Sequence, residues 1–270
     1  MRKIFGYILL TIGAFSMLVP FLWMVSVSLM QNAQIFAYPP KYIPNPVVIS
    51  NYTAVFKVAP IAKYFLNSLF VAAVTVVGQI ITASLAGYAF ARLKFKHKNL
   101  LFFLVLITMM IPPQVNIIPL FFMMREFGWL NTYQALIVPG MFGGFGIFLM
   151  RQWFMSLPRE VEEAARIDGC NIFQIFHKVA LPLALPVVAT LAVFTFIVTW
   201  NSFMWPLITV SSESMRTLPL GLAEFKDSFV DITDWAQLMA CSVISCIPVI
   251  AVFLLGKKYF INNLLSGSSK

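Results

Sequence analysis

The residues able to do chemistry in this chain are few, and they form no catalytic pattern. The sequence has three cysteines, Cys170, Cys241 and Cys246, and two histidines, His97 and His177. These are too few and too widely spaced for a metal site or a disulfide framework. The phosphate-binding pattern Gly-x-x-x-x-Gly-Lys-Ser/Thr does not occur, so the chain is not expected to hydrolyse ATP. A non-enzyme without a metal or cofactor of its own is therefore predicted.

Isolated polar and aromatic side chains inside long apolar runs indicate a different chemistry, the passage of a neutral solute. Sugar hydroxyls pair with uncharged donors and acceptors, and sugar C–H faces stack on aromatic rings, so no charge is required. Each of these groups could instead make a hydrogen bond between helices, and that alternative stays open. The candidate residues of a solute path are Trp200 and Asn201, followed by Thr199, Asn67 and Gln114.

The composition indicates that the elements carrying these groups lie in lipid. Of 270 residues, 60% are hydrophobic and 11% are charged, and the mean hydropathy is +0.86. Soluble domains carry roughly 25% charged residues, so a cytosolic globular enzyme is largely excluded. The net charge of +9 is scattered between apolar runs instead of gathering on an aqueous face. Nucleic acid is therefore not an expected partner.

Six uncharged runs are long enough to cross a membrane as helices. A hydrocarbon core needs about 20 helical residues, whereas the apolar part of a cleaved signal peptide, the alternative for the first run, has about 7–15. Pro112 and Pro113 are expected to bend or break the third run. Four glycines in the fourth, at 140, 143, 144 and 146, favour close helix packing. The predicted spans are approximately 4–30, 64–91, 99–124, 131–150, 180–210 and 236–256, in a single domain of residues 1–270.

The basic residues predict the orientation of these spans. With the N-terminus inside, the inner segments hold 13 Lys and Arg and the outer segments hold 6. Cytoplasmic segments carry this excess, so both termini are predicted to be cytoplasmic. No ionisable residue lies well inside any run, which disfavours ion-coupled transport. The cationic stretch from Arg92 to Lys98 fits a stop signal after a span, with binding of anionic lipid as the alternative.

Between the fourth and fifth spans, the sequence has the features of a helix, a turn and a second helix. Ser156 can cap the first helix, and Pro158 suits its first turn. Gly169 tolerates the left-handed conformation that ends a helix, and Asn171 with Gln174 can begin the next one as a capping box. A helix lying on the membrane surface and a helix entering a cleft on another protein both remain open.

This loop resembles the signature of ABC importer membrane subunits, which is EAA, three residues, G, nine residues, I or V, one residue, and LP. The spacing matches at every position. Shorter segments across nearly the whole chain resemble the carbohydrate-uptake, maltose-type branch, among them 88–92, 110–113, 118–120 and 205–207. The residues that match the signature are Glu163, Ala164, Ala165, Gly169, Val179, Leu181 and Pro182.

The resemblance implies an all-α permease subunit with six transmembrane helices in the prokaryotic cytoplasmic (inner) membrane. Residues 151–182 would form a coupling loop. The implied partners are a second permease subunit, an ATP-binding subunit dimer that holds ATP and Mg²⁺, and an extracytoplasmic solute-binding protein at the acidic outer segment 201–235. The tail 264–270 would reach into the ATPase dimer, or be a frayed terminus. The residues implied to dock on the ATPase are Glu163, Ala164, Ala165, Asp168 and Gly169.

The predicted function is ATP-driven import of a sugar or oligosaccharide by alternating access, with ATP bound at the partner subunits. A polyol or glycerol-phosphate is the alternative cargo, for which the sister subunit would supply basic residues. Two alternatives come from other classes of protein. One is an ATP-independent homo-oligomeric channel or facilitator, and the other is a structural subunit of a membrane assembly that transports nothing.

Overall fold

The computed structural model describes residues 2–227 and 234–267, and describes side chains over 4–223 and 234–258. Every regular element in these ranges is helical. The chain forms two compact units. The first comprises Met1–Leu66 and Thr217–Pro248, and the second comprises Asn67–Arg216 and Val249–Lys270.

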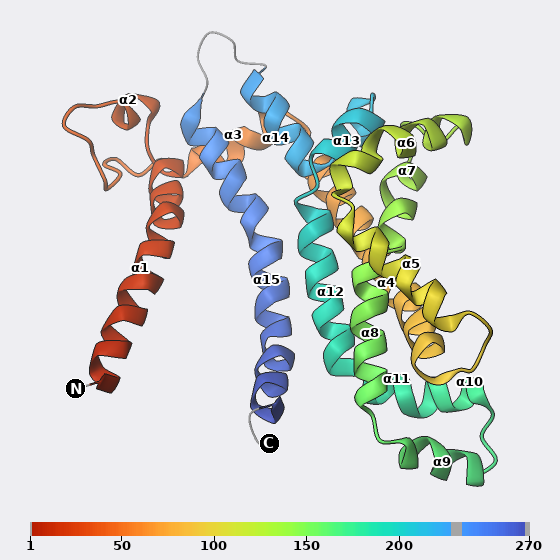
Figure 1. Cartoon of the computed structure of the whole chain (residues 1–270). Helices are drawn as coiled ribbons and strands as arrows, with labels where there is room; N and C mark the ends of the chain where they lie inside the picture. The colour runs from red at the N-terminus through yellow and green to blue at the C-terminus, as the bar shows by residue number, and fades with distance from the viewer. Residues whose placement is uncertain (1, 228–233, 268–270) are drawn as a thin grey trace. The chain divides into compact units, whose positions relative to one another are not determined.

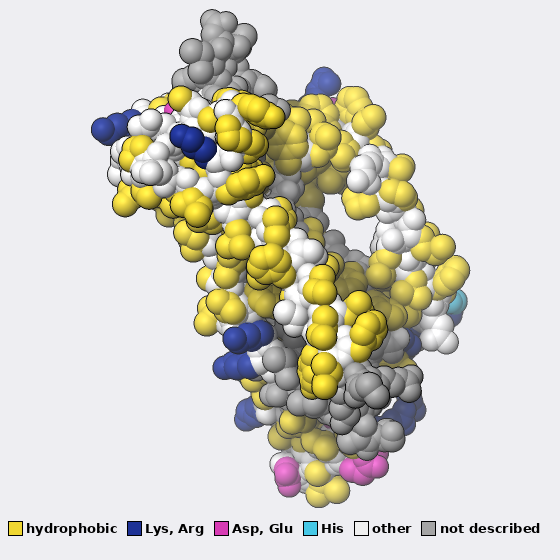
Figure 2. Space-filling view, turned by 90° about the vertical axis from the view of Figure 1, so that its left-hand side faces the viewer, with side chains coloured by type: hydrophobic (Ala, Val, Ile, Leu, Met, Phe, Trp, Pro, Cys, Tyr) yellow, Lys and Arg dark blue, Asp and Glu magenta, His cyan; other side chains and the backbone are white. Residues whose placement is uncertain are grey.

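Four helical segments are long and apolar enough to cross a membrane, and two bent helix pairs raise this number to six if each pair is one span. The prediction of an all-helical membrane protein is confirmed, while the cytoplasmic orientation of the termini stays a prediction. Figure 2 shows a surface that is mostly hydrophobic along the helices, as lipid contact requires. The four segments are α1 (Arg2–Ser28), α4 (Ile61–Arg92), Tyr133–Ser156 and α15 (Trp235–Gly267) (Figure 1).

The third and fifth predicted spans are bent. Helices α5 (Lys98–Met110) and α6 (Pro113–Glu126) meet at 104°, and the break expected at Pro112 and Pro113 is confirmed. The fifth span differs from the single helix expected over 180–210. Its two parts, Ile172–Leu183 and α12 (Leu185–Trp200), meet at 74° because prolines interrupt the helical hydrogen bonding near this bend. The following helix, α13 (Met204–Thr209), is separate.

In the first unit, side-chain amides join the helix ends. The Asn51 amide donates to the carbonyls of Ser28 and Met30, at 3.0 and 2.9 Å. The Ala236 N–H donates to Asn32 Oδ1 at 3.3 Å. Almost all of α1 is exposed in this chain, so its apolar surface is available to lipid. The short helices of this unit are α2 (Asn32–Ile35), α3 (Ser50–Val58) and α14 (Leu218–Asp227).

In the second unit, glycines bring the helices into close contact. Tyr133–Ser156 consists of α7 (Tyr133–Ile137), η1 (Val138–Met141) and α8 (Gly144–Ser156). A Cβ atom placed on Gly143 would lie 2.4 Å from the Gln79 amide nitrogen on α4, and one on Gly146 would lie 3.0 Å from Ala83 Cβ. The close packing expected of these glycines is thus confirmed. The buried core around them is Ala83, Tyr88, Met150, Phe154, Phe176, Ala180, Ala184, Val187 and Leu191.

We expect Gly87→Ala to destabilise the second unit. The new Cβ would lie 2.6 Å from Met150 Cβ and 2.9 Å from the backbone nitrogen of Arg151, so α4 and α8 would have to separate. Overpacking of this kind lowers the free energy of unfolding by about 1–3 kcal/mol. The measurement is thermal unfolding of the purified protein in detergent. Gly13→Ala is the control, because its Cβ meets nothing within 4 Å, and equal midpoints for the two variants would contradict the packing.

Candidate functional site

The first helix of the predicted coupling loop is α9 (Arg159–Ile167), which follows α8 after a short turn (Figure 1). The expectation that Ser156 caps it is wrong. Ser156 still belongs to α8, and its hydroxyl donates to the carbonyl of Trp153 at 2.7 Å. Pro158 occupies the cap position of α9 instead. Its ring restricts φ and cannot continue α8, so one helix ends and the next begins there.

The turn that follows α9 is the one predicted at Gly169. This residue has φ +83°, in the left-handed region, and its N–H donates to the carbonyl of Arg166 at 3.0 Å. The next helix, α10 (Ile172–Ile175), begins with the expected capping box: Asn171 Oδ1 accepts from the Gln174 N–H at 2.9 Å, and Gln174 Oε1 accepts from the Asn171 N–H at 2.8 Å. The helix, turn and helix order is confirmed.

Helix α9 has an inner face and an outer face. Glu162 and Ala165 are buried against the rest of the chain. The outer face carries the other residues predicted to dock on a partner, all of them exposed, which are Glu163, Ala164, Asp168 and Gly169. Ile167 lies among them with 87% of its surface exposed. Figure 2 shows acidic side chains gathered at the lower end of the molecule, where Figure 1 places α9.

A buried ion pair holds the inner face of α9. Arg92 Nε, at the end of α4, lies 2.8 Å from Glu162 Oε1, and both side chains are 9% exposed. An Nη of Arg92 also donates to the Leu157 carbonyl at 2.6 Å. This pair is not among the features predicted from the sequence, in which Arg92 begins a cationic stretch. The signal in the sequence is the acidic residue directly before the Glu163-Ala164-Ala165 run.

The remaining signature residues lie where the predicted coupling loop leads into the fifth predicted span. Val179 belongs to the π-helical turn η2 (Phe176–Ala180), and Leu181 and Pro182 begin α11 (Leu181–Leu183). Single π-turns of this kind occur frequently at functional sites. Phe176 is buried against Tyr88 of α4 at a ring distance of 5.2 Å. The first residue of η2 is therefore packed against the end of α4.

A cavity of about 460 Å³ in the second unit brings two of the predicted path residues together. Gln114 on α6 and Thr199 on α12 both line it, and we call it the polar cavity. No ionisable side chain is among its lining residues. Three further residues line the cavity that are not among the predicted path residues, Thr75, Ser202 and Trp205. The Thr75 hydroxyl is buried and has no hydrogen-bond partner among the described residues.

The other predicted path residues do not line the polar cavity. The Asn67 amide donates to the carbonyls of Ser214 and Arg216, at 3.0 and 2.8 Å, and Asn67 Oδ1 accepts from the Tyr133 hydroxyl at 2.8 Å. Trp200 is 1% exposed and its ring lies 5.6 Å from that of Phe196. Asn201 is exposed at the end of α12, and its amide donates to the Ile197 carbonyl at 2.8 Å.

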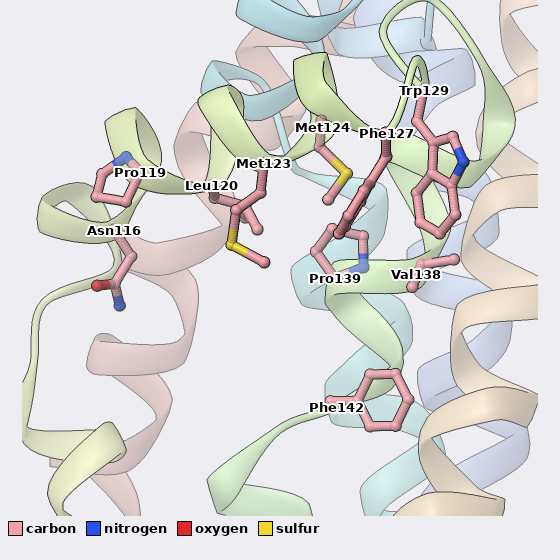
Figure 3. Close-up of a pocket in the computed structure, with 10 residues that line it drawn as sticks. All are labelled: Asn116, Pro119, Leu120, Met123, Met124, Phe127, Trp129, Val138, Pro139 and Phe142. Atoms are coloured by element: carbon pink, nitrogen blue, oxygen red, sulfur yellow. The ribbon is translucent and has the colours of Figure 1, made fainter.

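A second cavity, of about 520 Å³, is mainly apolar. Figure 3 shows side chains of α6, the following turn and η1 surrounding it, with Asn116 as the one side-chain amide among the labelled residues. Methionine, phenylalanine and proline side chains cannot pair with several hydroxyl groups. The polar cavity therefore suits a sugar better. The residues labelled are Asn116, Pro119, Leu120, Met123, Met124, Phe127, Trp129, Val138, Pro139 and Phe142.

Comparison with known proteins gives a family match and close relatives. Residues 79–264 match the family described as "Binding-protein-dependent transport system inner membrane component". The arabinooligosaccharides transport system permease protein AraQ of Halalkalibacterium halodurans is 36% identical over an alignment of 273 positions, which covers 97% of this chain and 96% of that protein. The sn-glycerol-3-phosphate transport system permease protein UgpE of Yersinia enterocolitica is 34% identical over 268 residues, 97% of this chain and 95% of that one.

A solved structure is also similar over nearly the whole length. It is described as a bacterial ABC transporter involved in the import of the acidic polysaccharide alginate, and its matching chain has a TM-score of 0.85 and 27% sequence identity. The match covers 96% of each chain.

We expect Asn67→Ala to weaken the second unit without affecting α9. The substitution removes the three hydrogen bonds of the buried Asn67 side chain, which lowers the free energy of unfolding by about 1–3 kcal/mol. Thermal unfolding in detergent measures the effect. Asn99→Ala, at an exposed position of α5, is the matched control. A midpoint for Asn67→Ala equal to that of the control would show that this amide contributes little.

Proposed function

Since the chain belongs to the family of binding-protein-dependent transport system inner membrane components, we propose that it moves a sugar or oligosaccharide through the polar cavity. It is a permease subunit of an ABC importer, a multi-pass protein of the bacterial inner membrane. ATP is hydrolysed in a separate subunit, and no cofactor belongs to this chain. An ATPase and a solute-binding protein are its partners.

The cargo class rests on the chemistry of the polar cavity. Its accessible hydrogen-bonding groups are the neutral side chains of Gln114, Thr199 and Ser202, and Trp205 supplies an aromatic ring. Hydroxyl and amide groups can donate to and accept from sugar hydroxyls, and an aromatic ring suits the C–H face of a pyranose or furanose. The similarity to AraQ, which is named for arabinooligosaccharides, supports this class.

An anionic cargo is the second candidate, because UgpE is named for sn-glycerol-3-phosphate. A phosphate or carboxylate group is normally bound by Arg, Lys or several backbone N–H groups. None of the residues lining the polar cavity carries a positive charge. For this cargo, the second permease subunit would have to supply the cation.

The ATPase is proposed to bind the outer face of α9. Ala164 allows close approach, Glu163 and Asp168 offer carboxylates to an Arg or Lys, and the exposed Ile167 supplies an apolar contact. Ala165 contributes from the inner face, by packing the helix in place. In this arrangement the loop and both termini are cytoplasmic, in agreement with the distribution of basic residues.

The second permease subunit and the docking of the solute-binding protein on the outer segment 201–235 are further parts of the proposal. In that segment, Asp231 and the side chains of Glu224 and Asp227 lie outside the described residues, as do the side chains of the tail 264–270. Glu213 is exposed there. A homo-oligomeric channel or a structural assembly subunit would need none of these partners.

We expect Glu163→Lys to prevent co-purification of the ATPase, because the exposed carboxylate becomes a cation at the proposed contact. The measurement is mass spectrometry of the tagged chain, isolated from native membranes in mild detergent. Glu126→Lys makes the same charge change at an exposed site at the end of α6 and should retain the ATPase. Equal ATPase recovery with both variants would refute docking through this face, and isolation of the unmodified chain alone as a homo-oligomer would favour the channel.

We expect the reconstituted transporter to import a neutral arabinooligosaccharide and to reject sn-glycerol 3-phosphate when both are offered in proteoliposomes. Gln114→Leu should lower sugar uptake about tenfold, the effect of losing one hydrogen bond of about 1.4 kcal/mol. Asn116→Leu is the matched control, because Asn116 lies on the same helix but lines the apolar cavity. Preferred uptake of the phosphate ester would favour the second candidate cargo, and equal effects of the two variants would exclude Gln114 from the path.

A further inference from the structure

Arg92 connects the end of α4 with two points of the segment that contains α9. Its Nε lies 2.8 Å from Glu162 Oε1 on the first turn of α9, and an Nη donates to the carbonyl of Leu157 in the turn before that helix. One guanidinium therefore contacts both the approach to α9 and the helix itself. All three residues belong to the same compact unit.

The burial of this pair makes the connection hard to break. Both side chains are 9% exposed, so separating them would leave two charges with little access to water. Removing one partner of a buried ion pair is strongly unfavourable for that reason. Glu163, the next residue, is exposed on the outer face. Two adjacent carboxylates thus point to different surroundings, one toward α4 and one away from this chain.

The end of α4 is itself packed rigidly against its neighbours. Tyr88, one turn before Arg92, contacts the rings of Phe154 on α8 and Phe176 on η2 at 5.3 and 5.2 Å. At Gly87 the backbones of α4 and α8 approach so closely that a Cβ would not fit. Close packing of this kind transmits displacement instead of absorbing it. A shift of α9 would therefore move α4 as a body.

The same helix reaches the proposed cargo site. Thr75 on α4 lines the polar cavity, and it lies 17 residues before Arg92, about 25 Å along a helix. We propose that Arg92 and Glu162 are positioning residues that link α9 to α4, so that movement of α9 changes the polar cavity. This inference rests on the proposed function, in which the ATPase binds α9. It adds the route by which that contact reaches the cargo.

The test uses the complete complex of both permease subunits and the ATPase in proteoliposomes. Ser202→Cys, with the three native cysteines changed to serine, reports on the polar cavity through its rate of reaction with a water-soluble maleimide. The readout is the reaction rate with ATP and vanadate divided by the rate without them. This measurement does not require the cargo to be known. ATPase recovery with the complex is measured on the same samples. If the pair were purely structural, its variants would change stability and ATPase recovery. The labelling ratio measured on the assembled complexes would then stay unchanged.

Glu162→Gln should reduce the ATP-dependent ratio toward one, which is the value expected when ATP no longer changes access to Ser202→Cys. The double variant Arg92→Glu with Glu162→Arg should restore most of it, because the opposite charges face each other again. Glu126→Gln is the control. It makes the same change at an exposed site at the end of α6, away from the face proposed to bind the ATPase, and should leave the ratio unchanged. If Glu162→Gln does not assemble, the double variant decides: a restored ratio supports the linkage and an unrestored one overturns it.

The two proposals fail in different ways. An unchanged ratio in assembled Glu162→Gln, beside a normal response of the unmodified complex, overturns the linkage and leaves the docking proposal intact. The linkage is also overturned if the ATP-dependent ratio is reduced as much in the double variant as in Glu162→Gln. If the unmodified chain recovers no ATPase, the docking proposal fails, and the linkage fails with it.

Discussion

Hydrocarbon offers no hydrogen bonds to the backbone, and the rest of this structure depends on that constraint. Each unsatisfied N–H or carbonyl group in lipid is costly, so a spanning segment must be helical or shielded by protein. The described chain follows this rule. Its bends lie at prolines, and the α5–α6 break adjoins the polar cavity, which Pro113 and Gln114 line. The backbone groups freed at this break are therefore next to a cavity with polar side chains.

Contact between apolar helices in lipid has little hydrophobic driving force, because lipid is as apolar as the side chains. Small residues and buried polar pairs provide the specificity here. Gly87 and Gly146 bring α8 against α4, and the Thr195 hydroxyl donates to the Gln79 side chain at 2.6 Å. These contacts make α4, α8 and α12 a tightly packed group. A permease that changes between two arrangements needs such groups, which move as bodies about their boundaries.

Adjacent residues of helix α9 face different surroundings, the interior of this chain and the surface. Its inner residues, Glu162 and Ala165, are buried against this chain, whereas Glu163 and Ala164 are left on the surface. Helical geometry requires this division, because residues three apart share a face and adjacent residues do not. The left-handed turn at Gly169 then returns the chain to the core through α10 and η2. One short helix thus combines an internal attachment with the surface that we propose to bind the ATPase.

Local features of this fold could be predicted from the sequence, because they depend on neighbouring residues. These include the apolar runs, the break at Pro112 and Pro113, the turn at Gly169 and the capping box that follows it. Contacts between distant residues could not. Arg92 and Glu162 are far apart in the chain, and only tertiary packing brings them together. A polar residue in an apolar run can equally bind a solute or a neighbouring helix. Gln114 lines a cavity and the Asn67 amide is occupied by backbone carbonyls, because the available partner depends on which helices meet.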